Sequence, residues 1–399
     1  MADLRYLVLV PDGAADYALD ELDGCTPLQA AKTPNMDRLA LQGQGGMVQM
    51  IPPSRHPGSD VGNLEIFGYD STVHYTGRAP LEAASMGLEM GPDDIAFRCN
   101  LVYNEGDTLV DYSAGHIETE EGRALVEELG ARLGTETIRF FPGVGYRHIV
   151  LYDQGPEGLT SYPPHDIMGQ SGREHLPQGE GVETIHALME KAAPILAEAK
   201  TNAERTARGE RPANGIWLWG EGRPLILPSV GERYGVKAGV ISAVDLVRGI
   251  GSCAGYEVID VPGITGYLDT NYEGKAQYAL DAFRAGTDLL YVHVEAPDEA
   301  GHNGDAAAKV QALEDFDGRV VAPLLKGLDN DGVPVRGLMT PDHRTPIPNR
   351  THTREPVPFV LWGEGIDADD MSTYDEVGAE LGSQQVEHGH RLMATLLQK

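Results

Sequence analysis

An aspartate and a histidine lie four residues apart, just after an apolar segment. The segment Leu289–Val294 is rich in β-branched residues and predicts a buried strand. Asp298 and His302 follow Pro297, and helical backbone there would place both side chains on one face. A carboxylate and a neutral imidazole on one rim can bind a divalent metal ion and leave positions open for a substrate.

Other polar residues of the same types follow predicted strands elsewhere in the chain. Open α/β sheets bind ligands beyond the carboxyl ends of their strands, so we expect these side chains to meet at one edge of a sheet. They are Asp12 after Leu4–Val10, Ser59 after Gly46–Ile51, Asp342 and His343 after Val335–Met339, and His352 just before Val357.

Aspartates and histidines together favour manganese, zinc or a related ion, because magnesium alone prefers oxygen ligands. Two close metal ions can hold the attacking and leaving oxygens of a phosphoryl transfer. A serine hydroxyl bound beside them becomes a nucleophile, so Ser59 is the candidate catalytic residue. Each residue alone also has a structural explanation: Asp12 could shape a turn, Ser59 could be a helix N-cap, and His352 could be an ordinary loop histidine.

Some familiar motifs are missing from the sequence. It contains no GxxxxGK[ST], HExxH or GxSxG pattern. Their absence argues against a P-loop enzyme, a zinc protease of that type and a serine esterase.

Composition limits the class of protein further. The chain has 399 residues, of which 41% are apolar, so two domains are expected. Three widely spaced cysteines form neither a disulfide framework nor a zinc knuckle, and the N-terminus does not resemble a signal peptide, so a cytoplasmic location is expected. The net charge of -30 argues against nucleic acid and anionic membranes as partners. No apolar run approaches the ~20 residues of a membrane helix.

The pattern of elements predicts an α/β fold: a doubly wound sheet domain interrupted by a smaller α+β domain. The predicted segments are 1–91 and 211–399 for the metal-binding domain and 92–210 for the insertion. Short strands near 97–151 surround one helix over 118–133, which is typical of an α+β unit. We further expect a helix over 60–67 with Ser59 at its N-cap. A long helix over 182–208 and a closing helix over 385–397 complete the prediction.

Six segments resemble a known family. VPDG, PGSDVGNLEIFGYD, TGRAPLEAASMG, EAPDEAGHNGD, TPDH and THTREPVPF are similar to cofactor-independent phosphoglycerate mutases of the archaeal-type branch, in the alkaline phosphatase superfamily. The resemblance covers nearly the whole chain. It implies an alkaline-phosphatase-like sheet domain and two divalent metal ions, most simply Mn²⁺, with Zn²⁺, Co²⁺ or Mg²⁺ as alternatives.

The resemblance also implies roles for individual residues. One metal ion would be bound by Asp298, His302 and His352. The other would be bound by Asp12, Asp342, His343 and the Ser59 oxygen. Ser59 would accept the phosphoryl group of 3-phosphoglycerate and return it to the other hydroxyl, giving 2-phosphoglycerate without bisphosphoglycerate. That reaction belongs to glycolysis and gluconeogenesis.

One position departs from the family pattern. Many of these mutases read SEVGH at the nucleophile, whereas this chain has Asn63 in place of the histidine. Two alternatives to a mutase therefore stay open. The first is a metal-dependent phosphohydrolase, or a phosphotransferase to another alcohol such as homoserine, that uses the same serine. The second is a non-catalytic sheet protein with structural metal sites.

The insertion is expected to act as a lid that keeps water from the phosphoserine and supplies cations for the small phosphorylated substrate. A surface or structural role is an equal alternative for each candidate cation, and Lys275 is expected only to decorate a helix. The candidate substrate-binding residues in the insertion are Arg98, His116, Arg147, His165 and Asp166, and those on the main domain are Arg78 and Arg248. We rank Arg78, Arg98 and His116 first.

Overall fold

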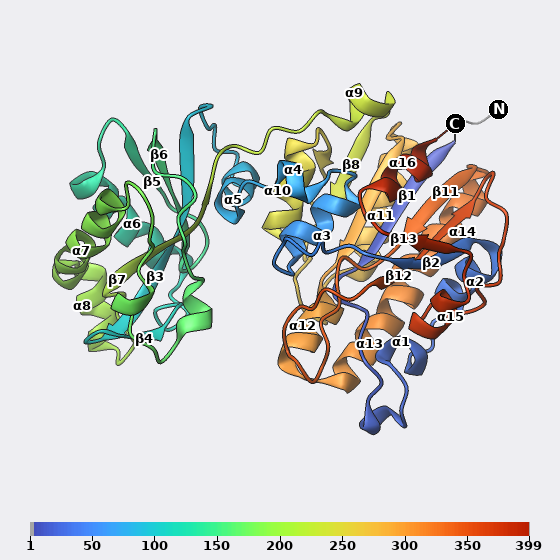
Figure 1. Ribbon diagram of the computed structural model, residues 1–399, viewed down its shortest axis with the longest axis horizontal. Helices are drawn as coiled ribbons and strands as arrows, with labels where there is room; N and C mark the ends of the chain where they lie inside the picture. Colours follow the sequence, from blue (N-terminus) through green and yellow to red (C-terminus); the bar gives the residue numbers. More distant parts are fainter. Residues whose placement is uncertain (1–3, 399) are drawn as a thin grey trace. The chain divides into compact units, whose positions relative to one another are not determined.

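The computed structural model describes residues 4–398, which form two compact units. The first unit contains the residues up to Tyr75 and those from Ile226 onward, and the second unit is Thr76–Leu225. Figure 1 shows both units coloured along the sequence.

The first unit is built on a sheet of eight strands in the order β13-β2-β12-β11-β1-β10-β8-β9. Strand β12 runs antiparallel to its neighbours β11 and β2, and the other strand pairs are parallel. The strands are β1 (Arg5–Pro11), β2 (Gln44–Val48), β8 (Ala238–Ile241), β9 (Glu257–Val258), β10 (Leu289–Val294), β11 (Val335–Met339), β12 (Val357–Gly363) and β13 (Gln384–Val386).

Strand direction decides which loops meet at the sheet edge. Strands β1, β2, β10 and β11 end at the same edge of the sheet, and the antiparallel β12 begins there. The loops that carry Asp12, Ser59, Asp298, Asp342 and His352 therefore all leave or enter the sheet on one side.

Helices pack on this sheet in two groups (Figure 1). One group contains α3 (Ser59–Ile66), α10 (Asp245–Cys253) and α16 (Arg391–Leu397). The other contains α2 (Pro34–Gln42), α11 (Tyr272–Arg284), α13 (Ala306–Phe316) and α14 (Ala322–Asp331), with a π-helical turn at Asp317–Val321. The remaining helices are α1 (Pro27–Ala30), α4 (Ser71–His74), α9 (Val230–Tyr234), α12 (Ala296–Asn303) and α15 (Glu376–Glu380).

The second unit has its own five-stranded antiparallel sheet and its own core. Strand β3 is its longest strand and pairs with β4, β6 and β7. The elements are α5 (Arg78–Ser85), β3 (Asp94–Glu105), β4 (Thr108–Asp111), α6 (Thr119–Leu133), β5 (Ile138–Phe141), β6 (Arg147–Asp153), α7 (Glu183–Glu198), α8 (Lys200–Ala207) and β7 (Gly215–Gly222).

The bounds of the second unit are wider than the predicted 92–210. Helix α5 packs against β3 and β7, and β7 pairs with β3, so both ends of the segment belong with this sheet. The whole fold is a mixed α/β arrangement, and the predicted α/β class is confirmed.

Three predicted helices differ from those observed. The long helix over 182–208 is two helices, because Ala199 is extended with ψ 131° between α7 and α8. The closing helix is shorter than expected, because residues 384–386 pair with β2 as strand β13. Ser59 is the first residue of α3, and Gly58 occupies the N-cap position without a side-chain hydrogen bond.

No helix within residues 4–398 has both the length and the apolar character that a membrane crossing requires.

A buried ion pair joins the loop after β1 to the segment after β11. Lys309 on α13 and Asp16 are both fully buried, with 2.7 Å between the ammonium nitrogen and Oδ2. Lys309 also donates to the Thr345 carbonyl oxygen at 2.8 Å, and Asp16 accepts from the Ile347 amide at 3.1 Å. The pair therefore holds together two loops that carry candidate site residues.

Replacing Lys309 by methionine should destabilise the first unit by about 3–5 kcal/mol, because it leaves the Asp16 charge buried without its partner. Urea unfolding followed by Trp362 fluorescence would measure this. The background would be Trp217→Phe with Trp219→Phe, since Trp362 is the first unit's only tryptophan. Lys326→Met, at an exposed position of α14, is the matched control and should leave the free energy of unfolding unchanged. Equal stability of the Lys309 and Lys326 variants would contradict a structural role for the pair.

Candidate active site

Two glycines allow the site loops to approach one another. Gly13 follows Asp12 with φ +59°, and its amide donates to Asp342 Oδ1 at 3.2 Å. A Cβ at Gly62 would lie 2.3 Å from the Asp342 carbonyl oxygen, so only glycine lets α3 lie this close to the loop after β11. Ser59, on the first turn of α3, is brought to the same loop.

The imidazole of His343 lies at the centre of the site. Its Nε2 is 3.0 Å from Ser59 Oγ, 3.3 Å from Asp342 Oδ2 and 3.6 Å from Asp12 Oδ1. Asp12, Asp342 and His343 are all buried. Burial raises the pKa of Asp12 well above its ordinary value, and the charges of Asp342 and Asp298 raise it further.

The other predicted ligands also lie close to His343. His302 Nε2 is 3.2 Å from Asp298 Oδ2 and 2.9 Å from His352 Nε2, and the rings of His343 and His352 have centroids 4.1 Å apart. Burial opposes the charged form of His302, but the hydrogen bond and charge of Asp298 raise its pKa to about 9. The structure therefore brings all seven predicted residues together.

Thr345 fixes the tautomer of His343. The Thr345 hydroxyl donates to Asp298 Oδ1, and its oxygen lies 3.2 Å from His343 Nδ1. The hydroxyl proton is already used, so Nδ1 carries the proton and donates to Thr345. The lone pair of Nε2 is therefore directed toward Ser59 and the carboxylates, and burial lowers the pKa of His343 to about 4.

These residues fit a metal ion. Two groups have ligand atoms close enough to share a cation: Asp12, Asp342 and His343, and Asp298, His343 and His352. Asp12 Oδ1 is buried and has no hydrogen-bond partner among the described residues. Two imidazole nitrogens 2.9 Å apart also need a proton or a cation between them. A mixed set of oxygen and nitrogen ligands suits a divalent transition metal ion.

A third group of similar composition has a structural explanation. Glu65, Asp70 and His390 also have ligand atoms close together. The Glu65 oxygens, however, accept hydrogen bonds from the Ser71 amide and hydroxyl and from the His390 amide and Nδ1. The carboxylate of Glu65 thus ties α3 to the start of α16.

Sequence reasoning missed the residues behind the ligands. His293, on β10, is fully buried with Nε2 3.0 Å from Asp12 Oδ2. Lys275 was expected to decorate α11, but it is fully buried, its ammonium donates to the His293 carbonyl oxygen at 2.7 Å, and burial lowers its pKa to about 8. His293 lies inside a predicted strand and Lys275 inside a helix. The only signal in the sequence that could have identified them is a polar side chain among apolar neighbours.

Three of the predicted substrate-binding arginines lie near one another in the second unit. Glu82 is 2.8 Å from Arg98 Nε and 3.3 Å from Arg78 Nε. Burial lowers the pKa of Arg98 to about 10, although Glu82 raises it, and the charges of Arg78 and Arg147 lower it further. Arg98 is buried with its guanidinium 4.3 Å from the Trp219 ring, whereas Arg147 is exposed. Glu82 and Trp219 were not predicted.

The remaining candidates are spread over both units. His165 contacts the Trp219 ring edge with centroids 5.9 Å apart and lies 3.7 Å from Asp166. His116 is exposed on a loop of the second unit with φ +50°. Arg248 belongs to the first unit, where it pairs with Asp260 at 2.7 Å.

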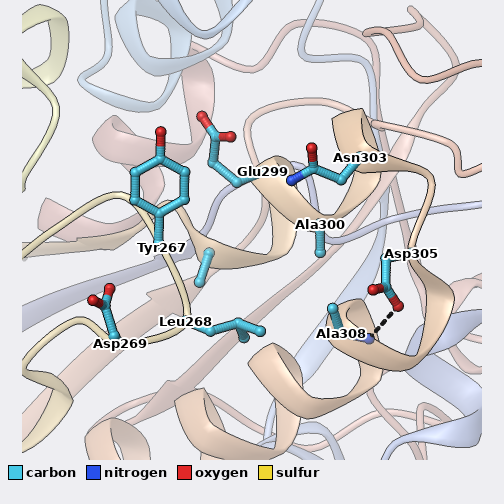
Figure 2. A pocket seen from close by; sticks show the side chains of 9 residues that line it. Tyr267, Leu268, Asp269, Glu299, Ala300, Asn303, Asp305 and Ala308 are labelled. Carbon is cyan, nitrogen blue, oxygen red and sulfur yellow. Dashed lines mark hydrogen bonds between the residues drawn. The ribbon is translucent and has the colours of Figure 1, made fainter.

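A pocket of about 440 Å³ lies along α12 beside the ligand residues (Figure 2). Glu299, Asn303, Tyr267 and Leu268 line this pocket. Glu299 follows Asp298 in the sequence, and Asn303 follows His302. None of the seven predicted site residues lines this pocket.

Comparisons with known proteins identify the family of the chain. Residues 40–202 match the family described as 2,3-bisphosphoglycerate-independent phosphoglycerate mutase. A Geobacter sulfurreducens protein named probable 2,3-bisphosphoglycerate-independent phosphoglycerate mutase is 51% identical, covering 99% of this chain and 100% of the relative. A Methanosarcina acetivorans mutase of the same name is 46% identical over 99% and 100% of the two chains.

A solved structure also shows the fold. The cofactor-independent phosphoglycerate mutase of Thermoplasma acidophilum matches with a TM-score of 0.68 and 26% identity, covering 100% of this chain and 99% of that one. A Pyrococcus horikoshii protein of solved structure matches with a TM-score of 0.84 and 28% identity over 100% and 97%. The predicted resemblance is confirmed, and the chain belongs to the family of 2,3-bisphosphoglycerate-independent phosphoglycerate mutases.

Proposed function

We propose that this protein is an isomerase that interconverts 3-phosphoglycerate and 2-phosphoglycerate through a phosphorylated Ser59, without bisphosphoglycerate. The observation that carries the proposal is the 3.0 Å distance between Ser59 Oγ and Nε2 of His343, the residue common to both ligand groups. Membership of the mutase family supports the choice of reaction.

In the proposed reaction Ser59, deprotonated to the alkoxide, attacks the phosphorus of 3-phosphoglycerate. A P–O bond forms to Ser59, the P–O bond to O3 of the glycerate breaks, and O3 takes a proton. The O2 hydroxyl then attacks the phosphoserine, loses its proton, and Ser59 leaves as the alkoxide. Hydroxyl and amide side chains do not gain or lose protons near neutral pH, so these proton transfers fall to carboxylates and imidazoles of the site.

We propose Asp12, Ser59, Asp342 and His343 as the ligands of one divalent cation, and Asp298, His302 and His352 as those of a second, most simply Mn²⁺. When bound, such ions would lower the pKa of the Ser59 hydroxyl and stabilise charge on the phosphoryl oxygens. The protein's own part is to hold the seven side chains and the His343 tautomer in place through Thr345.

For the anionic groups of the substrate we propose Arg78, Arg98 and Arg147 of the second unit. Arginine binds carboxylates and phosphates with two parallel hydrogen bonds. Glu82 forms ion pairs with the first two, and a bound substrate anion would have to replace part of this pairing. The lid role of the second unit, the roles of His116, His165, Asp166 and Arg248, and the cytoplasmic location stay predictions.

Purified protein supplied with Mn²⁺ and 3-phosphoglycerate should produce 2-phosphoglycerate with no bisphosphoglycerate added. Enolase added in excess converts that product to phosphoenolpyruvate, whose absorbance gives the rate. Parallel measurement of inorganic phosphate separates the alternatives, because a phosphohydrolase would release phosphate steadily and make no 2-phosphoglycerate. Transfer to homoserine without isomerisation would equally overturn the proposal.

A further inference from the structure

Strand β10 places two polar side chains behind the ligand carboxylates. Tyr291 and His293 are two residues apart, so they project from the same face of the strand, and both are fully buried. One is linked to Asp342 and the other lies against Asp12. These are the two carboxylates that could share a cation with His343 next to Ser59.

The link from Tyr291 runs through Asn63. The Tyr291 hydroxyl donates to Asn63 Oδ1 at 2.6 Å, and Asn63 Nδ2 donates to Asp342 Oδ2 at 2.7 Å and to the Ser59 carbonyl oxygen at 2.9 Å. A tyrosine hydroxyl donating to the amide oxygen fixes the amide nitrogen on the Asp342 side. The Tyr291 ring is itself held by stacking on Phe67, with centroids 4.1 Å apart and planes at 7°.

The link from His293 has the same chemical character. The Val244 amide donates to Ser242 Oγ at 3.0 Å, which leaves the hydroxyl proton of Ser242 for His293 Nδ1 at 3.2 Å. A neutral imidazole that accepts at Nδ1 carries its proton on Nε2. That nitrogen lies 3.0 Å from Asp12 Oδ2 and has no hydrogen-bond partner among the described residues, so the two groups are within reach of each other without an aligned hydrogen bond.

We propose that Tyr291, acting through Asn63, and His293 are positioning residues that orient the Asp342 and Asp12 carboxylates with neutral donors. This inference rests on the proposed metal-dependent function. Neutral donors fix the carboxylate planes without cancelling their charge, whereas a lysine or arginine in their place would compete with the cation.

The test measures Mn²⁺ affinity of the metal-stripped full chain, counting free Mn²⁺ by its electron paramagnetic resonance signal. His293→Leu should weaken the tighter Mn²⁺ site about 10- to 100-fold. Tyr291→Phe should weaken Mn²⁺ binding less, because Asn63 keeps its hydrogen bond to Asp342 and loses only the hydroxyl that fixes the orientation of its amide group. His293→Gln keeps an N–H donor and should restore part of the loss, which a purely structural role would not predict.

Tyr256 offers a matched control for Tyr291. It packs on the same Phe67 ring with centroids 5.0 Å apart, and its buried hydroxyl has no hydrogen-bond partner among the described residues. Tyr256→Phe removes the same atom from the same aromatic cluster and should leave Mn²⁺ affinity unchanged. If His293→Leu proves unfolded by circular dichroism, the two tyrosine variants decide the question.

The outcomes separate the two proposals. An unmodified chain that binds no Mn²⁺ would overturn the proposed metal-dependent function. An unmodified chain that binds Mn²⁺, together with Tyr291→Phe and His293→Leu variants that bind it equally well, would overturn the positioning role alone. Equal weakening in Tyr256→Phe and Tyr291→Phe would also overturn it, since the effect would then come from packing.

Discussion

Replacing Ser59 by alanine is expected to reduce turnover on the order of 10⁴-fold or more while leaving metal affinity near that of the unmodified protein. The hydroxyl oxygen is the only atom removed, and it is the proposed carrier of the phosphoryl group. Metal affinity should survive because the carboxylates of Asp12, Asp342 and Asp298 and the imidazole of His343 stay in place. The coupled enolase assay gives the turnover, and a Mn²⁺ titration of the stripped protein gives the affinity.

Ser54→Ala is the control for this variant, because Ser54 is exposed in the same loop and belongs to neither ligand group. Acid quenching of the unmodified enzyme during turnover, followed by peptide mass spectrometry, should find phosphate on the peptide that contains Ser59. Turnover retained in Ser59→Ala, or phosphate found on another residue, would remove the covalent mechanism.

The sheet of the first unit could be predicted from sequence where the strands are apolar throughout. Strands β10 and β11 begin and end at the predicted residues, because central parallel strands are buried on both faces and read as continuous apolar runs. Parallel order then places their carboxyl ends together, which is why residues from Asp12 to His352 could be assigned to one edge before any distance was known.

Elements decided by tertiary pairing could not be predicted in this way. Strand β13 has three residues and exists because it pairs with β2, and β7 was missed because its role is to extend the sheet around β3. The break at Ala199 comes from one extended residue inside a helical pattern. No local pattern marks such positions, since the partner that stabilises them is distant in sequence.

The residues of the candidate site likewise divide into those that the sequence predicts and those that only the structure reveals. The residues just beyond the strand ends are polar although packing alone would favour apolar side chains there. Their residue types therefore identify them as candidates for the site. Tyr291 and His293 lie within a buried strand, and a tyrosine there reads as ordinary core. The substrate-binding candidates rested on short polar segments alone, and the structure gathers Arg78, Arg98 and Arg147 but not Arg248, which belongs to the other unit.

Replacing His343 by alanine should weaken Mn²⁺ binding more than any other single histidine replacement at the site. His343 is the one residue common to both groups of potential ligands, whereas His352 belongs to one of them. Loss of an imidazole ligand, unlike loss of the neutral Ser59 hydroxyl, should cost more than the about 10- to 100-fold expected for a residue behind a ligand. His343→Ala should therefore reduce affinity by more than about 100-fold at the site proposed for Asp12 and Asp342. It should weaken the second site as well, because His343 also lies within reach of Asp298 and His352, whereas His352→Ala should affect the second site alone.

The comparison of His343→Ala with His352→Ala uses the number of bound ions as well as the affinity. Elemental analysis after dialysis against low Mn²⁺ should find fewer ions per chain in His343→Ala than in His352→Ala. His388→Ala, at an exposed position outside both groups, should match the unmodified protein. Equal losses in the His343 and His352 variants would show that the two groups do not share a ligand. An unchanged number of bound ions in His343→Ala, together with lower turnover, would show instead that this imidazole only orients Ser59.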